Sequence, residues 1–103
     1  SAALHVESDT ARALRRVFAN ASHPSYGVRD VLETTEGVLV LRAHGPGGEH
    51  EVELAPRDEA RPAFALTKRF AVRYRAEGAP VDERLLRAVI RAVERWEQRL
   101  EEE

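Results

Sequence analysis

The sequence contains no cysteine and no methionine, and a single lysine stands against fifteen arginines. Without cysteine the chain forms no disulfide bond and no thiolate metal site, which fits a reducing compartment. No apolar run approaches the about 18 residues that a membrane-spanning helix needs. We therefore expect a cytoplasmic protein that has no membrane partner. The preference for arginine over lysine is typical of a GC-rich genome, so an arginine alone is not taken as evidence of function.

Composition and charge narrow the class of protein. The 103 residues are 43% hydrophobic and 33% charged, which is typical of one globular domain that covers residues 1–103. The formal net charge of −2 gives no basic field that would draw the chain onto nucleic acid. Because Ser1 is not a native start, we interpret residues 1–3 as a tag remnant or a cut edge, and a domain excised from a larger protein is one reading. Residues 101–103 are expected to fray.

Two segments have the three- and four-residue spacing of apolar positions that indicates an amphipathic helix. The first covers residues 9–21, and Ser8 or Asp9 is its expected N-cap. The second is longer and covers residues 80–100. Its side away from the apolar stripe, which includes Glu97, is expected to be a solvated surface of mixed charge.

Four segments between these helices predict strands, at 26–34, 38–44, 49–54 and 63–75. Gly37 supplies the hairpin turn between the first two strands. The fourth segment is interpreted as one long or interrupted strand. We therefore predict the α+β class, with a four-stranded antiparallel meander sheet. The N-terminal helix and the long C-terminal helix pack on one face of it, in the order α-β-β-β-β-α.

The register of the second hairpin decides which residues share a face of the sheet. If His44 paired with His50, charged and apolar residues would be mixed on one face. If His44 pairs with Glu49, the apolar residues of both strands fall on one face and opposite charges meet on the other. We predict the second register, with an inner face beneath the helices and an outer face without a helix. The outer face then carries Arg29, Val31, Glu33, Val38, Val40, Arg42, His44, Glu49, Glu51, Glu53, Arg69, Arg73 and Arg75, and the inner face carries Val28, Leu32, Leu39, Leu41, Val52, Leu54, Phe70, Val72 and Tyr74.

The outer face carries an apolar cluster that neither predicted helix covers. Val31, Val38 and Val40 form it, and exposed clusters of this kind often mark a contact with another protein. The sheet also has edges to which an extended peptide could add a strand. The leading hypothesis is a non-enzymatic protein-interaction or accessory domain that binds a protein partner, or a second copy of itself, through the outer face or an edge strand. The candidate partner-binding residues are Val31, Val38, Val40, Arg42, Arg69, Arg73 and Arg75.

A second hypothesis places a pocket for a small polar ligand, or an enzymatic site, on the inner face. Asp30 and His50 both interrupt apolar inner-face positions, and the predicted pairing places Ala43 between them. Two titratable groups that flank a small residue are suited to binding a polar ligand or transferring a proton. Tyr26 or Tyr74 would lie nearby. The alternative is that these positions lie at the rim of the sheet, where polar residues meet water.

A third hypothesis is weak binding of single-stranded nucleic acid along Arg69, Arg73 and Arg75. The aromatic residues Phe70 and Tyr74 alternate to the other face, so rings and arginines form no common platform. Pairing of the arginines with the glutamates of the neighbouring strand explains them without a ligand. Nucleic acid is therefore not a favoured partner.

His44 and His50 flank one hairpin, a spacing that suggests a metal site. In the predicted register the two imidazoles point to opposite faces, so one ion could not reach both. We therefore expect no metal site and no cofactor.

Overall fold

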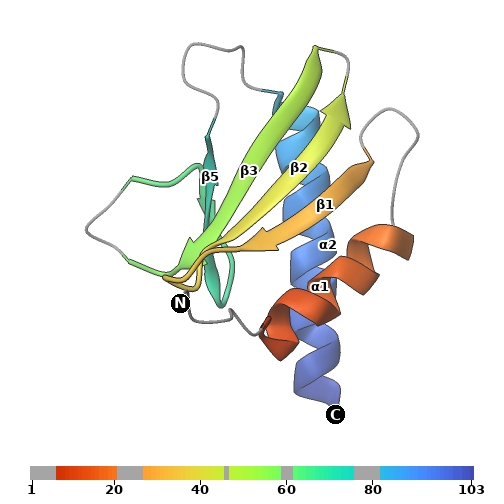
Figure 1. The fold of residues 1–103 in the computed structure, drawn as a ribbon. Helices are drawn as coiled ribbons and strands as arrows, with labels where there is room; N and C mark the ends of the chain where they lie inside the picture. The colour runs from red at the N-terminus through yellow and green to blue at the C-terminus, as the bar shows by residue number, and fades with distance from the viewer. Residues whose placement is uncertain (1–6, 21–26, 46, 59–61, 76–81) are drawn as a thin grey trace, which may run out of the picture.

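The computed structural model shows two helices and an antiparallel sheet (Figure 1), and it describes residues 7–20, 27–45, 47–58, 62–75 and 82–103. The α+β class is confirmed, with one helix before the sheet and one after it, but the sheet has five strands in place of four. The elements are α1 (Asp9–Asn20), β1 (Val28–Glu33), β2 (Leu39–Gly45), β3 (Gly48–Pro56), β4 (Ala65–Leu66), β5 (Phe70–Tyr74) and α2 (Glu83–Glu102).

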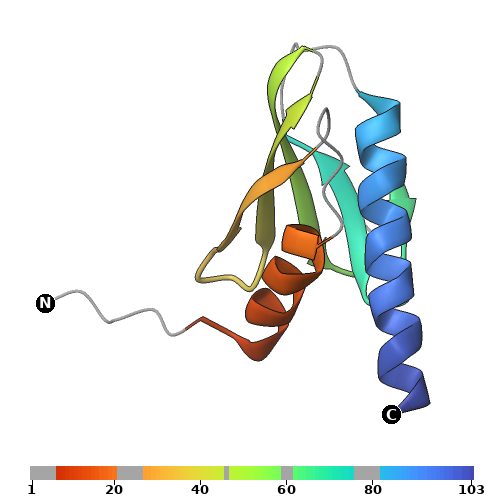
Figure 2. The ribbon, with the colours of Figure 1, turned by 90° about the vertical axis from the view of Figure 1, so that its right-hand side faces the viewer.

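Both helices lie on the same side of the sheet (Figure 2). α1 begins after Ser8, whose Oγ accepts a hydrogen bond from the N–H of Ala11 at 3.1 Å, so Ser8 acts as its cap. α2 begins after Asp82, whose carboxylate accepts a hydrogen bond from the N–H of Leu85 at 3.1 Å. The expected tag remnant at residues 1–3 lies outside the described residues.

The core lies between the two helices and the inner face of the sheet. Leu14 and Phe18 of α1 belong to it, as does Trp96 of α2. The rings of Phe70 and Trp96 stack with their centroids 6.4 Å apart. Each fully buried leucine or valine contributes about 1.5–3 kcal/mol to the free energy of unfolding. The largest fully buried side chains of the described residues are Leu14, Leu39, Leu41, Leu54, Leu85, Leu86, Val31, Val52, Val72, Val89 and Val93.

The β2–β3 hairpin has the predicted register. His44 pairs with Glu49, and the apolar residues of both strands share the inner face. His44 is exposed and His50 is buried, so the two imidazoles lie on opposite faces. Alternation in the sequence predicted this pairing correctly because a slip of one residue would move every apolar side chain of β3 into solvent.

The segment predicted as one strand at 63–75 forms a hairpin of two strands. β4 and β5 pair antiparallel with each other, and the strand order of the sheet is β1-β2-β3-β5-β4. The turn between them is held by the carboxylate of Glu97 from α2. It accepts hydrogen bonds from the hydroxyl of Thr67 at 2.9 Å and from the backbone N–H groups of Lys68 at 3.3 Å and Arg69 at 2.8 Å.

Glu97 is therefore buried, with 3% of the residue exposed, and its predicted place on a solvated surface is wrong. Helical periodicity put Glu97 beside other charged residues of α2. The turn that donates to its carboxylate lies about thirty residues earlier in the chain, and a pattern within one helix carries no information about it. Three donors make the burial of the carboxylate tolerable, because a buried charge without them would be costly.

β1 contains a bulge that the sequence analysis did not foresee. Val28 pairs with Ala43, as the two residues share the inner face, but Asp30 pairs with Arg42. Arg29 is therefore an extra residue between two consecutive cross-strand pairs. A bulge of this kind shifts the alternation of the strand by one residue beyond it.

Beyond the bulge, each residue of β1 lies on the face of the sheet opposite to the one that strict alternation predicts. Val31, which alternation placed on the outer face, is 1% exposed and belongs to the core. Leu32, predicted to be a core residue, is 40% exposed and pairs with Val40 of the outer face. Both predictions are wrong for the same reason, namely that strict alternation was applied across the bulge.

Candidate functional site

The outer face of the sheet points away from both helices (Figure 2). Side chains that are paired across neighbouring strands share a face, so the register identifies its members. Five apolar members form a continuous diagonal across all five strands. Three of the four steps are direct cross-strand pairs, and the step from β2 to β3 is diagonal. We name this set the apolar band: Leu32, Val40, Ala55, Ala71 and Leu66.

The ends of the apolar band are exposed, whereas its middle is covered. Leu32 in β1 is 40% exposed and Leu66 in β4 is 45% exposed, and these strands are the two edges of the sheet. Phe64, two residues before Leu66, is also 45% exposed. Among the described residues, no other large hydrophobic side chain is exposed. Val40 in the middle is only 4% exposed although no helix covers this face.

The exposed apolar cluster predicted on this face is wrong, because two of its three valines, Val31 and Val40, are buried. Val40 lies on the outer face as predicted, but it is buried in the middle of the apolar band. Val31 belongs to the core on the other side of the sheet, and Leu32 takes its place. Val38 precedes β2 and is half-buried.

Beside the apolar band, the outer face carries charged side chains that pair with one another. The guanidinium of Arg75 lies 3.9 Å from the Glu51 carboxylate and 3.6 Å from that of Glu53. Arg73 lies 4.0 Å from Glu53 and donates from Nε to the carbonyl of Pro62 at 2.7 Å. The side chains of Arg73 and Glu53 are 12% and 17% exposed. The predicted pairing with the glutamates of β3 is thus confirmed for Arg73 and Arg75.

The other two arginines that were predicted to bind a partner have different surroundings. Arg42 is exposed on the outer face, between Asp30 and Glu51 of the neighbouring strands. Arg69 is not on the outer face, because it belongs to the β4–β5 turn and its guanidinium lies 5.5 Å from the ring centroid of Trp96 in α2. The predicted stripe of three arginines is therefore wrong in this member, since the turn interrupts the alternation of the strand.

One edge strand of the sheet is partly engaged by α1, and the other is short. At the β1 edge, Arg15 of α1 donates from Nη2 to the carbonyl of Val31 at 2.6 Å. Ser8 donates to the Glu33 carboxylate from its backbone N–H at 2.9 Å and from its hydroxyl at 2.5 Å, which fixes α1 against the same edge. The opposite edge, β4, is only two residues long. Short or covered edges disfavour the addition of a strand from a partner.

His50 and Tyr74, two of the four predicted ligand-binding residues, are in contact on the inner face. Nδ1 of His50 shares a hydrogen bond with the hydroxyl of Tyr74, and the two rings meet edge to face with centroids 5.8 Å apart. His50 is 6% exposed, and its Nε2 has no hydrogen-bond partner within the part of the chain that the structure describes.

The other two predicted ligand-binding residues are not part of this contact. Asp30 pairs with Arg42 beyond the bulge and is exposed on the outer face. The predicted pair of Asp30 and His50 is therefore wrong, because the bulge turned the Asp30 side chain to the opposite side of the sheet. Tyr26 lies outside the described residues.

Asp82 is the carboxylate that the sequence analysis missed near His50. A Cβ added to Gly45 would lie 3.1 Å from Oδ2 of Asp82 and 3.2 Å from Cδ2 of His50, so both side chains crowd this glycine. Burial, together with the charge of Asp82, raises the pKa of Tyr74. In the sequence, Asp82 is recognisable only as the cap of a helix, and a cap does not show which part of the sheet the helix begins beside. The start of α2 therefore lies beside Gly45 of the sheet.

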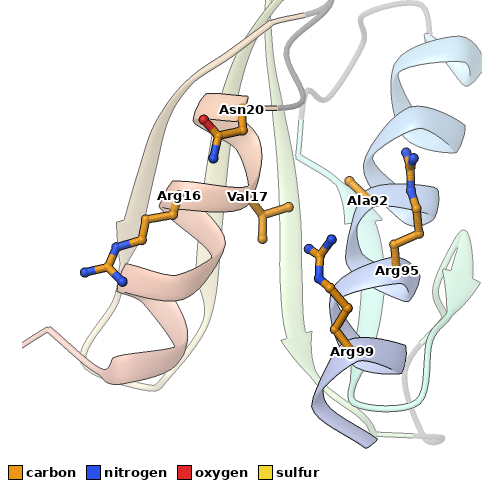
Figure 3. Close-up of a pocket in the computed structure, with 6 residues that line it drawn as sticks. All are labelled: Arg16, Val17, Asn20, Ala92, Arg95 and Arg99. Atoms are coloured by element: carbon orange, nitrogen blue, oxygen red, sulfur yellow. The ribbon is translucent and has the colours of Figure 1, made fainter. Parts of the chain in front are cut away.

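A groove of about 520 Å³ separates α1 from α2, and arginines from both helices line it (Figure 3). The side chain of Arg99 extends between the helices, towards Val17. The side chain of Arg16 extends away from α2, and that of Arg95 runs along α2 (Figure 3). The guanidinium groups do not converge on one point, as the binding of a single anion would require. We assign no site to this groove.

Within the described residues, the structure contains no group of three or more histidine, aspartate or glutamate side chains that could hold a metal ion. Neither of the two described helices has the length and apolar character that crossing a membrane requires.

Comparison of the chain with models of protein families, with curated proteins and with solved structures finds no match. The functional argument therefore rests on the residues and contacts of this chain.

Proposed function

We propose that this chain is a cytoplasmic, non-enzymatic interaction domain that binds a protein partner through the outer face of its sheet. The observation that carries the proposal is the place of the exposed apolar side chains. Leu32 and Leu66 are exposed at the two ends of one apolar band, on the side of the sheet that the helices leave open. Exposed apolar side chains that are connected in this way favour contact with another protein. The absence of cysteine supports the cytoplasmic setting.

The charge of the outer face favours a protein over nucleic acid. The described residues of this face contribute four carboxylates and four guanidinium groups, and a polyanion gains little from a surface without net positive charge. Arg73 and Arg75 already lie beside carboxylates of β3. The acidic members are Asp30, Glu49, Glu51 and Glu53, and the basic members are Arg42, Arg73, Arg75 and the bulged Arg29, whose guanidinium lies 3.3 Å from Glu49.

The outer face is a better binding surface than the edges of the sheet. Arg15 already donates a hydrogen bond to a backbone carbonyl at the β1 edge, and β4 has only two residues. Strand addition depends on a row of free backbone groups, whereas a contact on the face depends on apolar side chains. The proposal therefore assigns binding to the face.

A pocket for a small ligand on the inner face has less support. Asp30 does not join His50, and the hydroxyl of Tyr74 is already engaged with the imidazole. We therefore propose no enzymatic role for these residues.

The proposal is tested by capture of proteins from a lysate of the source organism with the wild-type chain and with outer-face variants. Leu32→Glu and Leu66→Glu each place a charge at an exposed end of the apolar band, so the fold is expected to tolerate them. Both variants are expected to lose the same captured proteins, because a buried charge opposes an apolar contact. Gln98→Glu, at an exposed position of α2, adds the same charge elsewhere and is expected to retain them.

Circular dichroism melting of each variant checks that it is folded. Leu32→Glu and Leu66→Glu are expected not to capture the same proteins as the wild-type chain and the Gln98→Glu control. If they do, the outer face is not the binding surface and the proposal is wrong.

A further inference from the structure

The solvent side of α2 carries a row of arginines. At about 100° per residue around the helix axis, four arginines at three- and four-residue intervals fall within a sector of about 80°. All four are exposed, and the sector lies opposite the buried side of α2 that includes Trp96. Arg99 lies four residues further on, but its side chain turns between the two helices (Figure 3). We name the four the arginine face: Arg84, Arg87, Arg91 and Arg95.

The exposed carboxylates of α2 lie beside the arginine face and not among its members. Glu83, Glu94 and Glu101 fall within about 20° of one another around the helix axis. Glu94 and Glu101 line a groove towards the β4–β5 turn, where Lys68 pairs with Glu101. The solvent side of α2 is therefore mixed in composition, but its two signs of charge are separated around the helix.

The fold makes little use of the arginine face. Arg87 pairs with Glu83 at 3.5 Å, and Arg95 donates from Nε to the carbonyl of Arg91 at 3.4 Å. In the part of the chain that the structure describes, Arg84, Arg91 and Arg95 form no ion pair with a carboxylate. Like charges four residues apart repel each other and slightly destabilise a helix. Carboxylates supplied by a partner would relieve this repulsion.

The spacing of the arginines matches that of alternate side chains in an extended peptide. Four residues of a helix rise about 6 Å, which separates Arg87 from Arg91 and Arg91 from Arg95. Every second residue of an extended chain lies about 6.8 Å further along. Each guanidinium can then meet one carboxylate, a pairing that arginine makes with two parallel hydrogen bonds. We propose that the arginine face binds an extended acidic segment of another protein, at a surface separate from the outer face of the sheet.

The surroundings of the arginine face favour a short acidic segment over nucleic acid. From Arg84 to Arg95 the face is about 16 Å long. Acidic side chains adjoin it, and the whole chain has a formal net charge of −2, so the positive field is confined to this length. The phosphate backbone of a nucleic acid continues beyond it. Single strands are also held by exposed aromatic rings, whereas Trp96 of α2 is buried on the other side of the helix.

The test is a nuclear magnetic resonance titration of the full chain, at low ionic strength, with a ten-residue peptide of alternating glutamate and serine. Backbone amide signals around the arginine face are expected to shift, with a Kd on the order of 0.1–1 mM because exposed ion pairs are weak. The double variant Arg91→Gln, Arg95→Gln is expected to raise the Kd about tenfold.

A matched control removes two exposed arginines from the other helix. The double variant Arg12→Gln, Arg16→Gln changes the net charge by the same amount and is expected to raise the Kd by less than about twofold, since screening weakens distant charges. A peptide that shifts no signals of α2 overturns the inference. An Arg91, Arg95 variant that binds the peptide as tightly as the α1 control also overturns it.

A deoxythymidine decamer, titrated in the same way, separates the two classes of partner. It is expected to bind more weakly than the peptide. Tighter binding of the decamer that is lost in the Arg91, Arg95 variant would make the arginine face a nucleic-acid site and the inference wrong. These results are independent of the outer face, because α2 lies on the other side of the sheet (Figure 2).

Discussion

The two faces of the sheet are built from the same strands, yet their side chains become buried in different ways. On the inner face, Leu41 and Val52 are fully buried under helices. On the outer face, Val40 is almost as well buried without a helix, and its direct cross-strand neighbour is Glu53. The helices cover the inner face, whereas on the outer face the centre of the apolar band is buried without a helix and Leu32 and Leu66 are exposed at the edges. On the uncovered face, the large apolar side chains that stay exposed thus lie at the rim.

The largest expected effect is a difference in the free energy of unfolding between a variant of the inner face and a variant of the outer face. Leu41→Ala on the inner face is expected to lower the free energy of unfolding by about 2–5 kcal/mol, because it removes buried methyl groups and leaves a cavity. Leu66→Ala on the outer face is expected to lower it by about 0.5 kcal/mol or less, since its side chain is already 45% exposed. Urea denaturation followed by circular dichroism measures both values, and losses of similar size would show that the outer face is also core.

The next largest effect is the loss of stability when a carboxylate is removed from each side of the sheet. Glu97→Ala is expected to lower the free energy of unfolding by about 2–3 kcal/mol, because it removes the acceptor for three donors of the β4–β5 turn. Glu53→Ala removes only ion pairs of the outer face and is expected to lower it by about 1 kcal/mol or less.

Denaturation curves again measure this pair of variants. Glu94→Ala, at an exposed position of α2, is the control for loss of a glutamate from the same helix and is expected to change little. A loss for Glu97→Ala no larger than that for Glu94→Ala would mean that the turn does not depend on the buried carboxylate.

The smallest effect concerns the inner face at high pH. Burial and the charge of Asp82 raise the pKa of Tyr74 above its ordinary value of 10.0. Unfolded chains then lose this proton at lower pH than folded chains, so the free energy of unfolding falls as the pH rises above about 10 and is unaffected by this group below it. Tyr74→Phe is expected to remove that part of the fall, as measured by thermal melts between pH 8 and 11.

Asp82→Asn sharpens this prediction, because asparagine still caps a helix but carries no charge. In a Tyr26→Phe background, Tyr74 is the only tyrosine, and its ionisation can be followed by ultraviolet absorbance. Its pKa is expected to fall when Asp82 is replaced by asparagine. A pKa that does not move would leave burial as the sole cause of the shift.

Patterns within single elements were sufficient for much of the fold. The spacing of Leu14 and Phe18 predicted α1, and alternation in the β2–β3 hairpin predicted its register. These predictions succeeded because one side of each element is buried along its whole length. A shift of the pattern by one residue would therefore expose apolar side chains. For the candidate site, the same reasoning placed Val40 on the outer face and predicted the pairing of β3 glutamates with Arg73 and Arg75.

The remaining features depend on segments that are distant in the chain. Alternation assigned Val31 and Leu32 to the wrong faces, since the bulge at Arg29 is visible only once β1 is paired with β2. The turn between β4 and β5 depends on Glu97 of α2. Periodicity specifies which residues of an element lie together, and it is the partner strand or helix that decides whether the period is interrupted and which side is covered. The residues of the outer face therefore follow from local alternation up to the bulge, and from tertiary contacts beyond it.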